Sequence, residues 1–245
     1  MGTTMRALAA CAVALAALAA LAFSGAATAR DLPVRTAPPE EIPPAPYDFR
    51  GMYFGFSLGL ANGSSTHSAA TGDLTPRIDL SGGTFGLGLG YNWRAGSLIY
   101  GVESDVSVST LKGSSGYLGA PVGFTAETSE RWLATYRVRA GYSLSQTWMA
   151  YVTGGGATAA MKITATEPGA GIASESQLRS GWTVGGGIEA GRIHSFAMKV
   201  EYLYVDFGNP SFFNPPPAGF FNRAGGVRLH EHIMRIGLNH KFQDF

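Results

Sequence analysis

The chain of 245 residues carries 18 Lys and Arg against 17 Asp and Glu, so its charge gives no general attraction to nucleic acid. Its single cysteine, Cys11, lies in the hydrophobic N-terminal stretch, which leaves the rest of the chain without disulfides, cysteine nucleophiles or cysteine-ligated metals. The 34 glycines have no collagen-like period, and no segment after Phe23 has the ~18 consecutive apolar residues of a membrane-spanning helix.

The N-terminus has the pattern of a secretory signal peptide. Arg6 precedes an apolar run over 7–23, and the tripeptide Ala-Thr-Ala follows at 27–29. A basic start, an apolar middle and a small-x-small ending predict cleavage after this tripeptide. A retained membrane-anchor helix is the alternative, and the cleavage-like tripeptide argues against it. We therefore expect residues 1–29 to be removed on export.

A proline-rich segment over 30–50 comes next. Its prolines and interspersed charges are typical of an extended, semi-rigid spacer without a core. We expect it to be a periplasmic leader that precedes a single β-domain over 51–245.

The residue pattern changes at Gly51, where large apolar residues begin to alternate with small ones. In the segment 51–61, one face carries Met52, Phe54, Phe56, Leu58 and Leu60, and the other carries mostly glycine, serine and alanine. The segment 82–93 repeats this arrangement. Period two over about ten residues is the signature of a tilted strand that crosses a membrane. A glycine-lined opposite face suits the crowded interior of a barrel better than a solvated surface.

Further segments of this kind lie at 99–109, 131–143, 148–159, 180–191, 196–208 and 230–242. Short connections alternate with four longer polar ones, at 62–81, 110–130, 160–179 and 209–229. This alternation places every short turn and both termini at one end. Closing the sheet removes edges whose unpaired backbone groups would be costly in lipid. The sequence predicts an all-β fold: an eight-stranded antiparallel up-and-down transmembrane β-barrel with short periplasmic turns and four long extracellular loops.

The same segments resemble a known family. The matching motifs, in order, are DLPVR (31–35), FRGMYFGFSLG (49–59), TFGLGLGYNW (84–93), YGVESDV (100–106), RVRAGY (137–142), YVTGGGA (151–157), GWTVGGGIE (181–189), KVEYLYVDFG (199–208) and MRIGLNHKF (234–242). The chain resembles the small outer-membrane porin-family proteins of alphaproteobacteria, of which the 25–31 kDa immunogenic outer-membrane proteins of brucellae and rhizobia are the type. This resemblance implies a cell outer membrane location in a Gram-negative bacterium.

The parity of the strands places a balanced set of charges inside the predicted barrel. The candidates are Glu103, Asp105, Arg137, Arg139, Glu189, Lys199, Glu201 and Arg235. A charge on the lipid face costs roughly 2–4 kcal/mol at the midplane for Arg or Lys, which favours inward placement. An eight-stranded barrel is narrow enough for side chains to fill. We expect these residues to form ion pairs that plug the lumen, and a narrow path for ions or small solutes is the alternative.

Other features support weaker hypotheses. His230 and His232 share a face of one strand and are weak candidates for metal or haem ligands at the rim. His67, in the first loop, is a candidate third ligand. Haem binding is associated with some members of the resembling family. Two imidazoles without a fixed third ligand make a poor site, so no cofactor or metal is expected. The adjacent His–Ser pairs, 67–68 and 194–195, lack a third group, so no enzymatic activity is expected.

The C-terminus carries a candidate signal for the outer-membrane assembly machinery. In the resembling family the chain usually stops at the aromatic residue of its last strand. Here Phe242 has the outward parity of that strand, whereas Phe245 is terminal with the opposite parity. The expected function is a structural or surface role in the cell envelope. The expected partners are outer-membrane lipid, lipopolysaccharide and the assembly machinery, with peptidoglycan as a further candidate, and no nucleic acid.

Overall fold

The computed structural model describes residues 47–69, 72–73, 77–116, 125–167, 169, 171–193, 195–209, 211–212 and 225–242. The predicted signal peptide, the predicted leader up to residue 46, His194 and Phe245 lie outside these residues. Within the described part of the chain, no helix is long and apolar enough to span a membrane.

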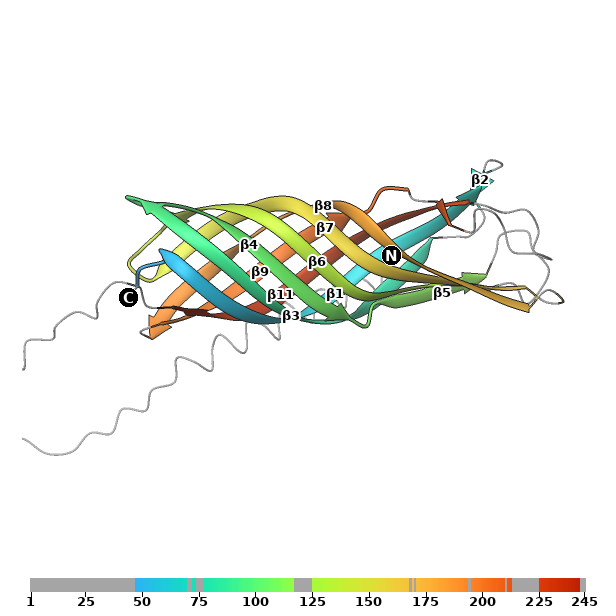
Figure 1. Ribbon diagram of the computed structural model, residues 1–245, viewed down its shortest axis with the longest axis horizontal. Helices are drawn as coiled ribbons and strands as arrows, with labels where there is room; N and C mark the ends of the chain where they lie inside the picture. The colour runs from blue at the N-terminus through green and yellow to red at the C-terminus, as the bar shows by residue number, and fades with distance from the viewer. Residues whose placement is uncertain are drawn as a thin grey trace, which may run out of the picture. The chain divides into compact units, whose positions relative to one another are not determined.

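Eight long strands form one closed antiparallel sheet (Figure 1). They are β1 (Gly51–Ala69), β3 (Ile78–Ala95), β4 (Leu98–Ser109), β6 (Thr125–Ser143), β7 (Trp148–Glu167), β8 (Gly171–Ile193), β9 (Phe196–Asp206) and β11 (Gly225–Lys241). Three short strands, β2 (Gly72–Asp73), β5 (Lys112–Gly116) and β10 (Ser211–Phe212), pair with them. Each long strand pairs with the next along the chain, and β11 pairs with β1 to close the ring. The predicted eight-stranded up-and-down barrel is confirmed.

The two faces of the wall separate as the period of two predicts. On β4 the side chains alternate between exposed and buried from Leu98 to Val108. On β1 the stripe that begins at Met52 and ends at Leu60 faces outward, and Leu58 is 58% exposed. Exposed apolar and aromatic side chains form a band around the outside, at 52–60 on β1, 85–93 on β3, 98–108 on β4, 136–142 on β6, 148–152 on β7, 182–188 on β8 and 196–202 on β9. We call this the apolar band, and it has the composition of a lipid-facing surface.

The glycine face makes room for large side chains inside the barrel. Tyr53 pairs across the sheet with Gly90, and a Cβ atom added to Gly90 would overlap the tyrosine ring. Tyr151 pairs with Gly187, where an added Cβ would lie 2.9 Å from the tyrosine hydroxyl. The inward glycines therefore let a narrow barrel hold bulky polar residues.

The strands extend past the apolar band further than predicted. Residues 160–167 and 171–179, for example, were expected to belong to a loop and instead continue β7 and β8 as a paired hairpin. On β7, Met161 and Ile163 remain buried, while the outward Lys162 is only half-buried. Outside lipid the outer face needs no apolar residues, so the contrast that marks a membrane strand disappears although the pairing continues. The connecting segments are accordingly shorter than predicted.

The opposite end of the barrel carries the short turns and both described termini. Gly96, with φ of 63°, forms the tight turn between β3 and β4. The Phe242 N–H donates a hydrogen bond to the Met52 carbonyl oxygen at 2.9 Å. Phe49 is buried against Tyr151 in a small apolar cluster with Ile99 and Met149. The last residues of the predicted leader thus pack into this mouth of the barrel.

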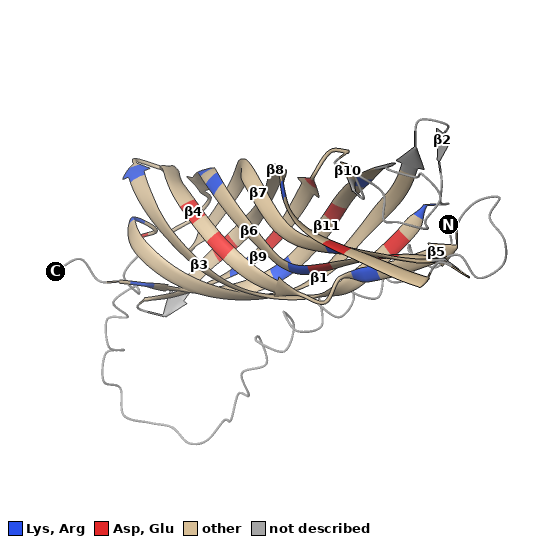
Figure 2. Ribbon diagram, turned by 45° about the vertical axis from the view of Figure 1, so that its right-hand side comes forward, with Lys and Arg blue, Asp and Glu red and all other residues tan. Residues whose placement is uncertain are grey.

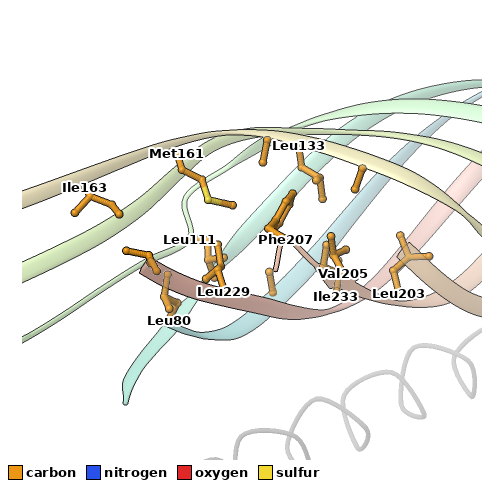
Figure 3. Close-up of a cluster of buried hydrophobic side chains, with 14 residues drawn as sticks. Leu80, Leu111, Leu133, Met161, Ile163, Leu203, Val205, Phe207, Leu229 and Ile233 are labelled. Carbon is orange, nitrogen blue, oxygen red and sulfur yellow. The ribbon is translucent and has the colours of Figure 1, made fainter. Parts of the chain in front are cut away.

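A larger apolar cluster lines the interior at the end beyond the apolar band (Figure 3). In this view Phe207 lies between the group of Leu111 and Leu229 and the group of Val205 and Ile233. The cluster as a whole comprises Ala61, Leu80, Leu111, Leu133, Ala157, Ala159, Met161, Ile163, Leu203, Val205, Phe207, Val227, Leu229 and Ile233. The interior therefore has an apolar outer half above a charged middle.

Candidate functional site: a charged cluster inside the barrel

The structure places all eight of the predicted inward charges in the interior of the barrel. Each is buried, with between 1% and 6% of its surface exposed. Figure 2 shows acidic and basic segments on neighbouring strands along the barrel wall. Cross-strand pairing sets opposite charges side by side, with Glu103 facing Arg137, Glu189 facing Lys199 and Glu201 facing Arg235. We call these eight residues the charged cluster.

Two arginines at the centre of the cluster bridge the same two carboxylates. Arg137 donates from Nη2 to Asp105 Oδ1 at 2.8 Å and from Nη1 to Glu201 Oε1 at 3.1 Å. Arg235 donates to both acids at 2.6 Å, through Nε to Glu201 and through Nη2 to Asp105. β6 and β9, and likewise β4 and β11, are not adjacent strands. These side chains therefore meet across the bore of the barrel rather than along its wall.

Glu103 connects the centre to the remaining bases. It accepts a hydrogen bond from Lys199 Nζ at 3.0 Å, is bonded by Arg137, and lies 3.5 Å from Arg139 Nη1. Arg139 in turn donates to Glu189 at 2.8 Å. The cluster is a single connected network of four acids and four bases.

Neutral side chains that were not among the predicted site residues complete this network. The Tyr53 hydroxyl donates to Glu103 Oε2 at 2.6 Å and accepts from Arg139 Nη1 at 2.9 Å. Tyr151 donates to Glu201 at 2.8 Å, and its ring lies 4.0 Å from the guanidinium carbon of Arg139. Thr135 donates to Asp105, and Asn239 donates to Glu189. The inward parity of these residues was the sequence signal that could have found them.

Burial explains why every charged group in the cluster has an oppositely charged partner. Removing a charge from water costs several kcal/mol, about as much as good pairing returns, so a balanced network is tolerated whereas a lone charge is not. The four acids and four bases leave no net charge. The arrangement is suited to filling and closing a narrow bore.

The three candidate histidines, 67, 230 and 232, lie at the end beyond the apolar band and on two faces of the wall. His230 and His232 face outward, where His230 Nε2 lies 3.0 Å from Ser64 Oγ and His232 Nδ1 lies 2.6 Å from the Tyr202 hydroxyl. His67 is buried inside the barrel, with Nε2 3.1 Å from Thr128 Oγ1. His67 is thus in a strand, not a loop, and it cannot complete a ligand set with the other two through the wall. Among the described residues, no three His, Cys, Asp or Glu side chains gather as metal ligands.

The contact between Ser64 and His230 joins a hydroxyl to a potential base, a pair that sequence adjacency did not reveal. A working nucleophile also needs a group that orients the histidine. Asp206 pairs with His230 across the strands, but its carboxylate accepts from the Tyr204 hydroxyl at 3.2 Å and the Gly208 N–H at 2.7 Å. Ser64 itself is 3% exposed. The pair resembles a cross-strand hydrogen bond more than an assembled catalytic site.

Comparison with known proteins gives concordant matches. The model of the outer membrane protein beta-barrel domain family matches residues 8–242. The chain is 30% identical over 243 residues to the 31 kDa outer-membrane immunogenic protein of Brucella melitensis, covering 94% of this chain and 99% of that protein. It is 30% identical over 202 residues to the 22 kDa outer membrane protein of Rhizobium leguminosarum, covering 81% and 82%. Among solved structures, the outer membrane protease OmpT of Escherichia coli has a TM-score of 0.52 at 9% identity, covering 78% of this chain and 96% of that one, which is a likeness of fold alone.

Proposed function

Since this chain belongs to the family of outer-membrane β-barrel proteins, we propose that it is a structural, surface-exposed protein of the Gram-negative cell envelope whose lumen is closed by the charged cluster. Its relatives carry names that describe immunogenic outer-membrane proteins. The observation that carries the proposal is the bridging of Asp105 and Glu201 by both Arg137 and Arg235.

The geometry of this bridge supports a closed bore. The four side chains come from four different strands, β4, β6, β9 and β11, and meet in the interior. An ion passing through would have to separate buried pairs, and breaking one such pair costs roughly 3–5 kcal/mol. Passage would therefore be slow compared with flow through a water-filled pore.

Planar-bilayer recording of the refolded protein tests the proposal. The wild-type barrel is expected to be silent. The R137A/R235A variant, which empties the centre of the cluster, is expected to show unit conductance steps. R228A removes the same type of side chain from the outer face of β11 and should remain silent. Persistent steps from the wild-type protein would establish the alternative, a narrow porin for ions or small solutes.

The proposed role is not enzymatic, and the contact between Ser64 and His230 makes this testable. Lipid-ester hydrolysis by the refolded protein in mixed micelles should not exceed the rate of protein-free micelles, and S64A should behave identically. Hydrolysis that is present in the wild type and lost in S64A would refute this part of the proposal.

The proposed partners follow from the surfaces that the barrel offers. Outer-membrane lipid contacts the apolar band, and lipopolysaccharide phosphates meet Arg228 and Arg77, which lie on the exposed outer end of the wall. The assembly machinery reads Phe242, whose side chain is exposed at the turn end of the barrel. Contact of the leader with peptidoglycan remains a proposal for residues outside the described part of the chain.

A further inference from the structure

Two buried acids, Glu130 and Glu231, lie apart from the charged cluster, at the end of the barrel beyond the apolar band. Glu231 on β11 pairs with Gly63, which follows the last exposed residue of the band on β1, Leu60. Glu130 on β6 donates its backbone N–H to the carbonyl oxygen of Leu111, beyond the last band residue of β4. Glu130 is 4% exposed and Glu231 is fully buried. Both acids face the barrel interior. Glu231 falls within the segment 230–242 that the sequence predicts to cross the membrane, but its outward-facing neighbours His230 and His232 are polar, so the membrane-spanning part of β11 begins after them and both acids lie beyond it.

Apolar side chains surround this pair. Glu130 pairs with Met161 on β7, and Glu231 pairs with Val205 on β9. Both of these neighbours belong to the large apolar cluster shown in Figure 3. An ionised carboxylate without a partner is strongly disfavoured in such surroundings.

Within the described part of the barrel, the two carboxyl groups have no basic side chain as a close partner, and each has the other carboxyl beside it. They lie within hydrogen-bonding reach of one another. Among the described residues, none of their four side-chain oxygens has a hydrogen-bond partner of full hydrogen-bonding geometry, and the donor that lies close by is the Ser109 hydroxyl, beside Glu130. Two carboxylates cannot bond to each other, since neither has a hydrogen to donate, and a single proton supplies the missing donor. The pair is complete only when it holds a proton.

No cation of the described residues offers an alternative to that proton. The charged cluster below is already balanced, and its bases are engaged with its own acids. The titratable and charged groups that face this end of the lumen from the surrounding strands are His67 on β1, Glu175 and Arg179 on β8, Glu201 on β9 and Arg235 on β11. None of these groups shifts the pKa of either glutamate. Besides burial, the pKa of Glu130 responds to Glu231 and the nearby Ser109 hydroxyl, and the pKa of Glu231 responds to Glu130.

The strand that carries Glu130 is irregular at this point. The register of β6 against β7 shifts between Glu130 and Trp132, which is a β-bulge. A bulge interrupts the ladder locally and leaves the extra residue unpaired. The wall beside Glu130 therefore has less backbone pairing to hold it, and a contact to β11 on another part of the ring adds a constraint there.

We propose that Glu130 and Glu231 form a proton-operated latch that ties β6 to β11 across the outer end of the barrel, closed while the carboxyls share a proton and released when both ionise. Release admits water to the apolar outer half of the lumen, while the charged cluster below keeps the middle closed. The latch does not depend on whether that cluster blocks conduction.

The acid strengths of the two groups place the transition in an accessible range. Burial raises the pKa of Glu130 to about 7, with the Glu231 carboxyl and the Ser109 hydroxyl acting in the opposite direction. Burial, and then the charge of Glu130, raise the pKa of Glu231 well above its ordinary value. The pair is expected to lose its protons in coupled steps as the pH rises from neutral to alkaline. Burial lowers the pKa of His67 to about 4, so this imidazole stays neutral throughout that range.

Hydrogen exchange of the refolded full-length barrel at pH 6 and pH 9 tests the latch. Protection factors, which remove the intrinsic pH dependence of exchange, are compared for the outer rows (61–67 and 227–233) and for the rows around the charged cluster (53–59 and 235–241). In the wild type we expect protection of the outer rows to fall at least ten-fold at pH 9 and protection of the cluster rows to stay constant.

Two variants and one spectroscopic signal complete the test. E130Q/E231Q replaces the acids with amides that donate without titrating, so its outer rows should be equally protected at both pH values. E127Q changes an outward-facing acid on the same strand and should behave as the wild type. The infrared carbonyl band of protonated carboxyls should be present at pH 7 in the wild type and weaker in the double variant. Equal protection of the wild-type outer rows at both pH values would overturn the proposal, as would the same loss in E130Q/E231Q.

Discussion

Removing Arg137 is expected to destabilise the barrel by about 3 kcal/mol, the lower end of the cost of breaking a buried ion pair. Arg137 is 3% exposed and pairs with Glu103, Asp105 and Glu201. In R137A the balance of four bases and four acids becomes three against four. The loss is moderated because every acid keeps a base: Arg235 still pairs with Asp105 and Glu201, and Lys199 still pairs with Glu103.

The double variant R137A/R235A provides the sharper form of this prediction. Asp105 and Glu201 have no ion-pair partner other than these two arginines among the described residues. Each single variant leaves one arginine to neutralise both acids, whereas the double variant leaves two buried carboxylates uncompensated. The double loss should therefore exceed the sum of the single losses, by about 1–3 kcal/mol for groups in one network.

Urea unfolding in lipid vesicles, followed by tryptophan fluorescence and by the gel shift between folded and heated protein, measures these differences. R228A, on the outer surface, should lie within about 0.5 kcal/mol of the wild type. A loss below about 1 kcal/mol for R137A, or additive losses in the double variant, would refute the account of the cluster as one interdependent network.

Four further predictions test other parts of the molecule. Y53F removes the hydroxyl that links Glu103 to Arg139 and should lower the free energy of unfolding by roughly 1.5–3 kcal/mol in the same assay. Y91F, on the apolar band, should lower it by less, and equal effects would contradict the inward role of Tyr53. L58R places a charge in the apolar band and should cost about 2–4 kcal/mol, against about 0–1 kcal/mol for N62R beyond the band; similar costs would mean that lipid does not contact this stripe. F49A empties the packed mouth at the turn end and should cost about 3–5 kcal/mol, and a neutral result would show that this segment is not docked. The stability of the wild type should fall as the pH rises from about 4.5 to 7, because over that range the folded protein holds the proton of Glu130 while the unfolded chain has released it, and the raised pKa of Glu231 extends the fall to higher pH; the decline should vanish in E130Q/E231Q, and its persistence there would assign it to other groups.

Most of the architecture could be predicted from the sequence because lipid imposes a simple rule. Every outward position between Met52 and Leu60 must be apolar, and every opposite position must fit a narrow interior, so the period of two reports the fold directly. The same parity assigned the charges from Glu103 to Arg235 to the inward face. Beyond the band this rule no longer applies, so the continuation of β7 and β8 as a hairpin was not evident.

The tertiary structure alone decided which of these residues meet. Parity assigns Arg137 to a face, but only the closure of β11 on β1 and the stagger of the strands bring it to Glu201, 64 positions away. The same closure places Glu130 against Glu231. The sequence predicts a loop at Glu130, and it draws attention to Glu231 only because that residue lies between two histidines. Local pattern determines the direction in which a strand side chain points, whereas contacts across the bore depend on how the whole ring closes.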